Sequence, residues 1–507
     1  MSDLPLLAAL RESARAHAAR PAVRGDDGTR LSYAQLLERI DALAAALRAA
    51  GCEPDETVLV RVSNHPLDFA AFAAVWAAGA VAVPVHRTAP DGSIAAIQQK
   101  ARARLALDAL AATPGQHTPA AAAPHAPADG APARRDMLRD AALVIFTSGS
   151  TGLPKGVVLS HRAFAGKLAE NQRLFGFTPD DTALLVLNDT FSFGIWFALV
   201  ALNHGAGLVT RSRFDAAGFL ATLAEERITR VGVVPTMIRA TFAALDAGAL
   251  ADARARLLAV GALRDMVIGG EPLGEELSAR LRALIAPARL WDVYGLTETS
   301  TSDFVLRPED YAAHPGSIGR PAAGVRHRIV DEQGAECAPG APGELQLATP
   351  FVMNGYLDDE AITREAFAGE WFRTGDLASH DGGGFVSIVG RLKDVVVRGG
   401  NKVTPPEIER ALCACPGVAA ALVAGLPDPV LGQRIHALLV PAQGEALDAA
   451  AIRAALADRL ERFKQPDACW VAADLPTGRT GKIDRGRLRA MIEAGELAPL
   501  PSWTRQA

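Results

Sequence analysis

Helical and short apolar segments alternate along the first hundred residues, and this alternation constrains the fold more than any other feature. Residues 33–50 carry leucines and alanines at helical spacing with charged residues on the opposite face, which predicts an amphipathic helix. Residues 57–62 predict a buried strand, a second helix is predicted over 67–78, and a second strand follows at 81–85. Such alternation is typical of a doubly wound α/β domain, so we expect an α/β fold.

A low-complexity stretch interrupts this pattern. Residues 111–133 are almost entirely Ala, Pro, Gly and Thr without periodicity, which predicts a surface loop or linker without chemistry. The α/β alternation then resumes. Short strands separated by turns over 326–390 indicate a β-rich subdomain at the end of the large part of the chain.

The last hundred or so residues predict a separate small domain. Strands are expected at 420–423 and 435–441, and an amphipathic helix at 449–460. We therefore predict a large N-terminal domain of doubly wound sheets with a β-rich subdomain over 1–392, and a small, mobile α+β C-terminal domain over 393–507.

Size and charge exclude several classes of protein. The chain has 507 residues, of which 49% are apolar and 21% charged, so it can bury a large core. The net charge is -5 at pH 7, and no basic stripe is present. Because a nucleic-acid-binding protein usually carries a basic excess, nucleic acid is not an expected partner.

The cysteines and the apolar runs predict a cytoplasmic protein without a membrane span. Five scattered cysteines do not form the framework of a secreted disulfide-rich domain. Cys413 and Cys415 lack the further ligands of a zinc site. The N-terminus has no secretory layout, and the apolar run at 69–85 is interrupted by Gly79 and Pro84 and is too short to span a bilayer.

A loop rich in Gly, Ser and Thr follows the apolar segment 142–146. The loop reads Thr147, Ser148, Gly149, Ser150, Thr151, Gly152, Leu153, Pro154, Lys155 and Gly156. Glycines let backbone N–H groups approach an anion, the hydroxyls donate further hydrogen bonds, and Lys155 supplies a mobile positive charge. These features suit a triphosphate. Pro154 and Gly156 on either side of Lys155 depart from the Walker A pattern, so a kinase or P-loop ATPase is not favoured.

Together with four later motifs, this loop resembles those of the adenylate-forming (ANL) superfamily, which includes acyl-CoA synthetases, peptide-synthetase adenylation domains and luciferases. The later motifs are 293–299 (VYGLTET), 371–376 (WFRTGD), the hinge region 390–409 and 476–485 (PTGRTGKIDR). The resemblance covers residues 31–489, and several motifs in the same order are far more specific than one. It implies the ANL fold and an AMP-forming acid–thiol ligase.

The resemblance assigns much of the loop to the β- and γ-phosphates of ATP. The residues concerned are Thr147, Ser148, Ser150, Thr151 and Lys155, and Gly149 and Gly152 would also bind the nucleotide. Thr297 would contact the α-phosphate. Glu298 would hold Mg²⁺, a hard cation that prefers carboxylate and phosphate oxygens.

The resemblance also implies where the nucleoside binds. Tyr294, followed by Gly295, would offer a flat face to adenine. The opposite face would be the backbone of Gly269, Gly270, Glu271 and Pro272. Asp376 would accept hydrogen bonds from both ribose hydroxyls, with Arg391 beside it.

Three features of the C-terminal part are assigned by the same resemblance. Lys482 would bridge the substrate carboxylate and the α-phosphate and stabilise the transition state, although a lysine in a polar loop is more often a solvated charge. Lys393 would be the pivot of a domain rotation that withdraws Lys482 after adenylation. Gly399 and Gly400 would then line a channel for the thiol arm, or form only a turn.

The predicted acyl pocket comprises Gly269 and a segment that resembles the corresponding part of amino-acid-activating domains. The members of this segment are Phe191, Ser192, Phe193, Gly194 and Trp196. Those domains carry an Asp where this chain has Gly194, and burying a substrate ammonium without a carboxylate is costly, so an α-amino acid is not expected. The aromatic residues favour an aryl or other apolar acid, although such a stripe is more often core.

We therefore predict ATP-dependent activation of a carboxylic acid to its acyl-adenylate with release of pyrophosphate, followed by thioester formation with coenzyme A. Coenzyme A is favoured because the chain ends soon after the lysine motif, without a fused carrier domain. Loading of a separate acyl or peptidyl carrier protein is the alternative. An inactive nucleotide-binding relative is a third possibility, which intact Lys155, Glu298, Asp376 and Lys482 argue against.

Overall fold

The computed structural model describes residues 4–110, 120–121, 135–147, 155–271, 273–442, 444–477 and 483–503. The chain divides into two compact units. The large unit comprises Met1–His327 and Leu347–Phe372, and the small unit comprises Arg328–Gln346 and Arg373–Ala507. The predicted α/β fold with a larger N-terminal and a smaller C-terminal part is confirmed. A movable boundary at residue 392 stays a prediction.

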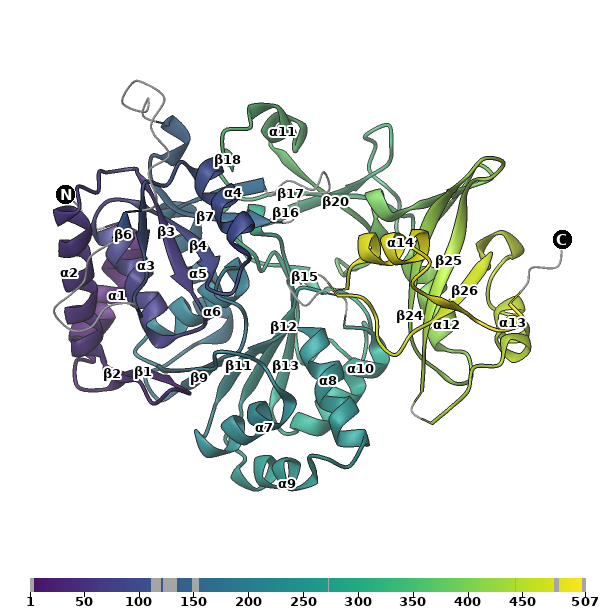
Figure 1. Cartoon of the computed structure of the whole chain (residues 1–507), viewed down its shortest axis with the longest axis horizontal. Coiled ribbons are helices and arrows are strands. Elements are labelled where there is room, and N and C mark those ends of the chain that lie inside the picture. Colours follow the sequence, from purple (N-terminus) through teal and green to yellow (C-terminus); the bar gives the residue numbers. More distant parts are fainter. Residues whose placement is uncertain are drawn as a thin grey trace. The chain divides into compact units, whose positions relative to one another are not determined.

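A nine-stranded sheet of the large unit has the strand order β15-β14-β13-β12-β11-β9-β10-β1-β2 (Figure 1). The strands are β1 (Pro21–Gly25), β2 (Arg30–Ser32), β9 (Thr182–Leu185), β10 (Gly207–Thr210), β11 (Arg230–Val233), β12 (Asp265–Gly269), β13 (Arg289–Tyr294), β14 (Phe304–Leu306) and β15 (Arg320–Pro321). The run from β1 to β13 pairs in parallel. Parallel pairing places the carboxyl ends of these strands at one edge of the sheet.

A seven-stranded sheet has the order β18-β8-β7-β4-β3-β5-β6. Its strands are β3 (Thr57–Val62), β4 (Val81–His86), β5 (Leu105–Leu107), β6 (Ala120–Ala121), β7 (Ala141–Thr147), β8 (Lys155–Ser160) and β18 (Gly355–Tyr356). The strands predicted at 57–62 and 81–85 are confirmed as β3 and β4. Because β8 pairs antiparallel with both β7 and β18, the phosphate-loop strands lie beside a segment some two hundred residues later in the chain.

The helices follow the sequence pattern closely. They are α1 (Pro5–Ala16), α2 (Tyr33–Ala49), α3 (Pro66–Ala77), α4 (Asp91–Ala101), α5 (His161–Phe175), α6 (Ser192–Asn203), α7 (Ala216–Glu225), α8 (Pro235–Asp246), α9 (Ala251–Val260), α10 (Glu275–Ile285), α11 (Glu360–Glu365), α12 (Pro405–Cys413), α13 (Ala449–Ala457) and α14 (Arg485–Glu493). The helices predicted at 33–50, 67–78 and 449–460 correspond to α2, α3 and α13. Short 3-10 turns include η2 (Thr297–Thr299) and η3 (Leu392–Asp394).

Helices α3 and α6 are apolar on every side. Nearly all their side chains are buried in one hydrophobic core with α1, α2 and the inner strands. A helix that is hydrophobic all round has no solvent face, which explains the charge-free run after Phe69. Among the described residues, no helix combines the length and apolarity needed to cross a membrane.

Two further sheets complete the fold. A five-stranded sheet contains β16 (Arg326–Val330), β17 (Gly343–Ala348), β19 (Phe367–Ala368), β20 (Trp371–His380) and β21 (Val386–Arg391). A six-stranded sheet contains β22 (Val396–Arg398), β23 (Asn401–Val403), β24 (Val418–Asp428), β25 (Gly432–Pro441), β26 (Ala468–Val471) and β27 (Ala498–Pro499). The strands predicted at 420–423 and 435–441 lie within β24 and β25, and together with α12 to α14 they form the predicted α+β part.

Candidate active site

The two ends of the predicted phosphate loop are adjacent. Thr147 ends β7, Lys155 begins β8, and the two residues pair directly in the antiparallel register. Ser148, Gly149, Ser150, Thr151 and Gly152 lie outside the described residues, so their assignment to phosphates stays a prediction. The strand pairing places the residues at the two ends of this segment side by side.

The next predicted motif follows β13 directly. Tyr294 is the last residue of β13, and the half-buried Thr297 and Glu298 begin η2. A Cβ atom on Gly295 would lie 2.3 Å from the backbone nitrogen of Ser302, so only glycine fits at this position. The Tyr294 ring packs edge-on against Phe304 with a centroid distance of 6.0 Å. The motif therefore forms a tight turn that leaves its polar side chains within reach of a ligand.

The predicted adenine-binding residues lie on adjacent strands. Gly269 pairs with Val293 in the β12–β13 register, so Gly270 and Tyr294 follow at the carboxyl ends of neighbouring parallel strands. This edge of an open α/β sheet is the usual place for a nucleotide. Glu271 forms an ion pair of 2.6 Å with Arg239 on α8. Pro272 lies outside the described residues.

Glu298 has a partner that the sequence motifs did not reveal. The Tyr356 hydroxyl donates a hydrogen bond of 2.9 Å to Glu298 Oε1, and Lys155 Nζ lies 5.2 Å from the centroid of the Tyr356 ring. Burial, followed by the charge of Glu298, raises the pKa of Tyr356, so the phenol stays a donor. Tyr356 is brought there by the β8–β18 pairing, which leaves no local signal in the sequence.

The donor set around Glu298 fits a magnesium ion. No group of three or more His, Cys, Asp and Glu side chains that could hold a metal occurs in the described part of the chain. Magnesium usually keeps several waters and is bound by one or two carboxylates together with substrate phosphates. One half-buried carboxylate, fixed by a tyrosine, is therefore sufficient on the protein side.

The predicted acyl segment touches the predicted α-phosphate residue. Ser192 is the first residue of α6, and its Oγ lies 3.2 Å from Thr297 Oγ1. A Cβ atom on Gly194 would lie 2.6 Å from the carbonyl oxygen of Asn188, so this position has no room for a side chain. The segment therefore approaches the phosphate side of the site through Ser192.

The aromatic members of the predicted pocket have different surroundings. Trp196 is fully buried, and its ring stacks between Phe175 and Phe193 at centroid distances of 5.7 and 5.4 Å. Phe193 is only partly buried, and a Cβ atom on Gly269 would lie 3.5 Å from its ring. The structure thus places Trp196 in the core behind Phe193, and brings Phe193 and Gly269 together. The role of Phe191, which is also partly buried, stays a prediction.

The small unit carries the predicted ribose and hinge residues. Asp376 on β20 is buried and pairs with Arg391 on β21 in register, with 2.9 Å between Arg391 Nε and Asp376 Oδ1. Lys393 lies in the exposed turn η3. Gly399 and Gly400, with φ of 56° and 81°, form the two-residue turn between β22 and β23. These glycines therefore form a turn, and their function in a thiol channel stays a prediction.

Lys482 lies outside the described residues, but both ends of its loop are fixed. Thr477 and Ile483 form an antiparallel bridge. Arg485 makes two hydrogen bonds of 2.7 Å to the carboxylate of Glu409 on α12. Both bonds come from the same nitrogen, Nη2, and they tie the first residue of α14 to α12.

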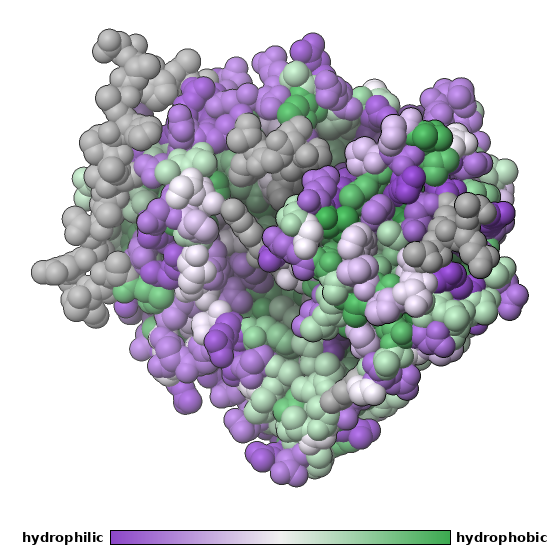
Figure 2. Space-filling model, turned by 45° about the vertical axis from the view of Figure 1, so that its right-hand side comes forward, coloured by the Kyte–Doolittle hydropathy of each residue, from purple (hydrophilic) through white to green (hydrophobic). Residues whose placement is uncertain are grey.

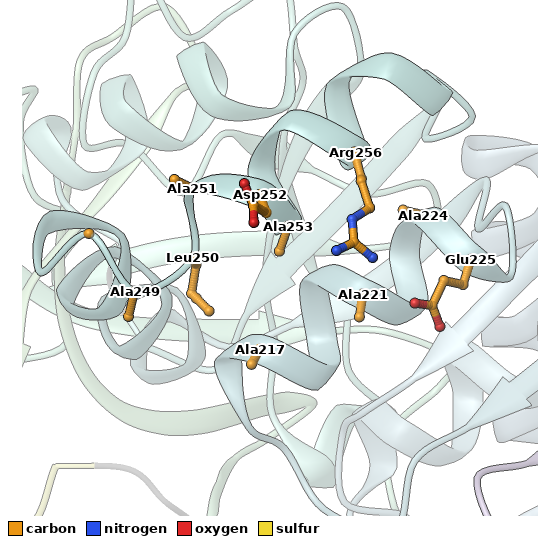
Figure 3. A pocket seen from close by; sticks show the side chains of 11 residues that line it. Ala217, Ala221, Ala224, Glu225, Ala249, Leu250, Ala251, Asp252, Ala253 and Arg256 are labelled. Atoms are coloured by element: carbon orange, nitrogen blue, oxygen red, sulfur yellow. The ribbon is translucent and has the colours of Figure 1, made fainter.

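A surface hollow elsewhere in the large unit is not part of this site. It has a volume of about 500 Å³ and lies between α7 and α9 (Figure 3). Alanines form most of its lining, with Glu225, Asp252 and Arg256, and Figure 2 shows pale green at the lower end where these helices lie. None of the predicted site residues lines it.

Comparison with known proteins identifies the family of this chain. Residues 10–357 match the AMP-binding enzyme family, and residues 407–482 match the C-terminal domain of AMP-binding enzymes. The chain therefore belongs to the AMP-binding enzyme family. Its predicted membership of the adenylate-forming superfamily and its prediction as a ligase are confirmed.

Individual relatives match over nearly the whole chain. The feruloyl-CoA synthase of an Amycolatopsis species is 34% identical over 474 residues, which cover 91% of this chain and 94% of that protein. The fatty acid–acyl-carrier-protein ligase ScoC of Streptomyces coeruleorubidus is 33% identical over 494 residues, covering 91% and 92%. The crystal structure of ATP-bound MatB from Rhodopseudomonas palustris is 27% identical with a TM-score of 0.82, and covers 97% of this chain and 99% of that one.

We expect Tyr356→Phe to weaken magnesium-dependent ATP binding. The substitution keeps the ring beneath Lys155 but removes the hydroxyl that fixes Glu298, and a hydrogen bond to a charged group contributes about 1.5–3 kcal/mol. The magnesium concentration that half-saturates ATP binding, measured by titration calorimetry, should rise about tenfold. The control is Tyr311→Phe, since the buried Tyr311 hydroxyl has no hydrogen-bond partner among the described residues. Equal effects of the two variants would contradict the role of Tyr356.

Asp292, two residues before Tyr294, should make stability depend on pH. Burial raises the pKa of its carboxyl from 3.8 to about 7. The protonated form is therefore favoured in the folded protein. Its contribution to the free energy of unfolding is complete below pH 3.8 and is lost as the pH rises to about 7. Asp292→Asn should consequently stabilise the protein by about 2 kcal/mol more at pH 8 than at pH 5 in urea unfolding. If the stability difference between Asp292→Asn and the unaltered protein did not change with pH, the raised pKa of Asp292 would be refuted.

Proposed function

We propose that this protein activates a carboxylic acid as its acyl-adenylate and transfers the acyl group to the thiol of coenzyme A. The observation that carries the proposal is the contact between Ser192 and Thr297. It supports placing the acid beside the α-phosphate within a single compact unit, with Glu298 and Lys155 on the phosphate side of the same contact.

In the first half-reaction the substrate carboxylate attacks the α-phosphorus of ATP, and pyrophosphate leaves. Lys155 attracts the β- and γ-phosphates, and Thr297 donates to the α-phosphate. A magnesium ion held by Glu298 would neutralise charge on the leaving phosphates. Tyr294 stacks on adenine across from Gly270.

The small unit supplies the remaining groups. Asp376 orients the ribose, and Arg391 holds this carboxylate in place by pairing with it. Lys482 neutralises the negative charge that gathers where the carboxylate and the α-phosphate meet. After adenylation, rotation at Lys393 withdraws Lys482 and admits the thiol past Gly399 and Gly400.

We infer that the acid is an aryl or other apolar carboxylic acid. The partly buried Phe193 ring beside Gly269 offers an apolar face. The absent side chain at position 194 removes the carboxylate that an α-amino acid would require. Similarity to a feruloyl-CoA synthase supports an aryl acid and coenzyme A.

The alternative acceptor is the thiol of a separate carrier protein. The chemistry of the transfer is the same, and one relative of nearly equal identity is named a ligase that acts on an acyl-carrier protein. In that case the thiol arm would reach the same glycine turn while attached to a protein.

The proposed function predicts acid-dependent release of pyrophosphate from ATP. A panel of aryl, fatty, dicarboxylic and amino acids is incubated with ATP and magnesium, with and without coenzyme A. An aryl or apolar acid should give the highest release, stimulated by coenzyme A, with the thioester detected by mass spectrometry. Release without a thioester would favour a carrier protein, and no release with any acid would contradict the proposal.

The two half-reactions should respond differently to Lys482→Ala. The variant should lose adenylation by at least a hundredfold, because the charge at the reacting carboxylate is gone, yet it should still convert supplied acyl-adenylate to thioester. Pyrophosphate release and thioester formation are measured separately, with the exposed Lys402→Ala of the same unit as control. Equal loss of both steps would refute withdrawal of Lys482 between them.

A further inference from the structure

Three consecutive residues next to the site have an unusual backbone. Ser300, Thr301 and Ser302 have φ of 60°, 63° and 53°, and their relative exposures are 0%, 8% and 1%. A non-glycine residue in this left-handed region costs on the order of 1–3 kcal/mol, and it persists only where its surroundings enforce it. The strained segment begins two residues after Glu298, so whatever enforces it also fixes the motif.

A buried ion pair contacts this segment. Lys167 Nζ on α5 lies 3.0 Å from Asp303 Oδ1, and the two side chains are 1% and 0% exposed. The same ammonium donates a hydrogen bond of 3.3 Å to the carbonyl oxygen of Ser302. The other carboxylate oxygen of Asp303 accepts a hydrogen bond from the hydroxyl of Thr299. One cation thus fixes the end of the strained segment directly and its beginning through Asp303.

Neighbouring contacts connect the pair to the other side of the site. Lys167 Nζ lies 4.9 Å from the centroid of the Phe351 ring. The carbonyl oxygen of Phe351 accepts a hydrogen bond of 2.8 Å from the hydroxyl of Ser300, and the Met353 N–H donates one of 2.7 Å to the carbonyl oxygen of Glu298. The strand that supplies Tyr356 follows directly, so both sides of the site are aligned through these contacts.

Stability alone does not account for a charge pair at this position. Removing two charges from water costs several kcal/mol each, and replacement of such a pair by apolar residues is often neutral or stabilising. Burial raises the pKa of Asp303 and opposes the charged form, while Lys167 lowers it. Unlike an apolar pair, an ion pair fixes the direction of the groups that are hydrogen-bonded to it.

We propose that Lys167 and Asp303 are positioning residues for adenylation. Their contacts hold residues 299–303 in the strained conformation, which presents Thr297 and Glu298 to the phosphates and to magnesium. Lys167 and Asp303 themselves bind neither the phosphates nor the magnesium ion. This inference rests on the proposed roles of Thr297 and Glu298. It assigns a function to Lys167, which the sequence pattern alone would place on the solvent face of an amphipathic helix.

The test compares ATP affinity with and without magnesium in variants of matched burial. The double variant Lys167→Met/Asp303→Asn removes both charges and should fold, whereas Lys167→Met alone leaves an unpaired buried carboxylate and should melt at a much lower temperature. The control is Arg230→Met, which breaks pairs with Asp265 at 2.7 Å and with Asp181 at 3.0 Å. These two carboxylates keep Arg289 and Arg264 as partners, so neither is left unpaired. Arg230 and Asp265 begin their strands, at the edge of the sheet opposite the candidate site.

Titration calorimetry on the full chain should separate a positioning role from a structural one. Magnesium should tighten ATP binding in the unaltered protein and in Arg230→Met, and this gain should fall at least tenfold in the double variant, with metal-free ATP affinity changed less than twofold. An undiminished gain in the folded double variant, or an equal fall in Arg230→Met, would overturn the inference. No gain in the unaltered protein would instead contradict the proposed function of Glu298.

Discussion

The parallel pairing of β9, β11, β12 and β13 is the constraint on which the candidate site depends. In such a sheet the strands end together, and the loops that follow them share one edge. Because Gly269 pairs with Val293, the glycine backbone and the Tyr294 ring are set side by side by register rather than by contacts of their own. Gly269 and Tyr294 therefore take their spacing from the backbone hydrogen bonds of this sheet.

Buried charge occurs at both edges of this sheet but has different consequences there. At the amino edge, Arg230 contacts the carboxylates of Asp181 and Asp265, which begin or precede their strands and are buried. These contacts join elements that backbone pairing already fixes. On the site side, Lys167 and Asp303 join α5 to the segment between β13 and β14. Backbone bonds hold this segment as well, since the Asp303 N–H donates to the carbonyl oxygen of Tyr294. The ion pair adds a side-chain connection from this segment to a helix.

Periodicity and motifs predicted the local structure well because both are local signals. The helix at 33–50 and the strands at 57–62 and 81–85 depend on neighbours in sequence, and the 293–299 motif carries its own turn chemistry. Tyr356 was missed because its bond to Glu298 joins residues 58 apart in sequence, and a short strand that pairs with β8 has no pattern of its own.

Lys167 and Trp196 were beyond sequence reasoning for a different reason. A lysine on an amphipathic helix is normally solvated, and its burial depends on Asp303, which lies 136 residues away. Trp196 belongs to a helix that is apolar on all sides, so no periodicity indicates which side chains face a pocket and which face the core. The phosphate loop and Lys482 are identified by their sequence motifs, and the structure describes the paired residues on either side of them.

The predicted acyl segment shows how backbone position can exclude a side chain. The carbonyl oxygen of Asn188 occupies the space that a side chain at position 194 would need, and the loop that carries it is held by Asn64. The Asn64 N–H donates to Asp189 Oδ2 at 3.2 Å, and the Asp189 N–H donates to Asn64 Oδ1 at 3.0 Å. These reciprocal hydrogen bonds fix the loop, so the carbonyl oxygen of Asn188 stays close to position 194. Introducing a carboxylate at position 194 would therefore require rebuilding two segments 125 residues apart.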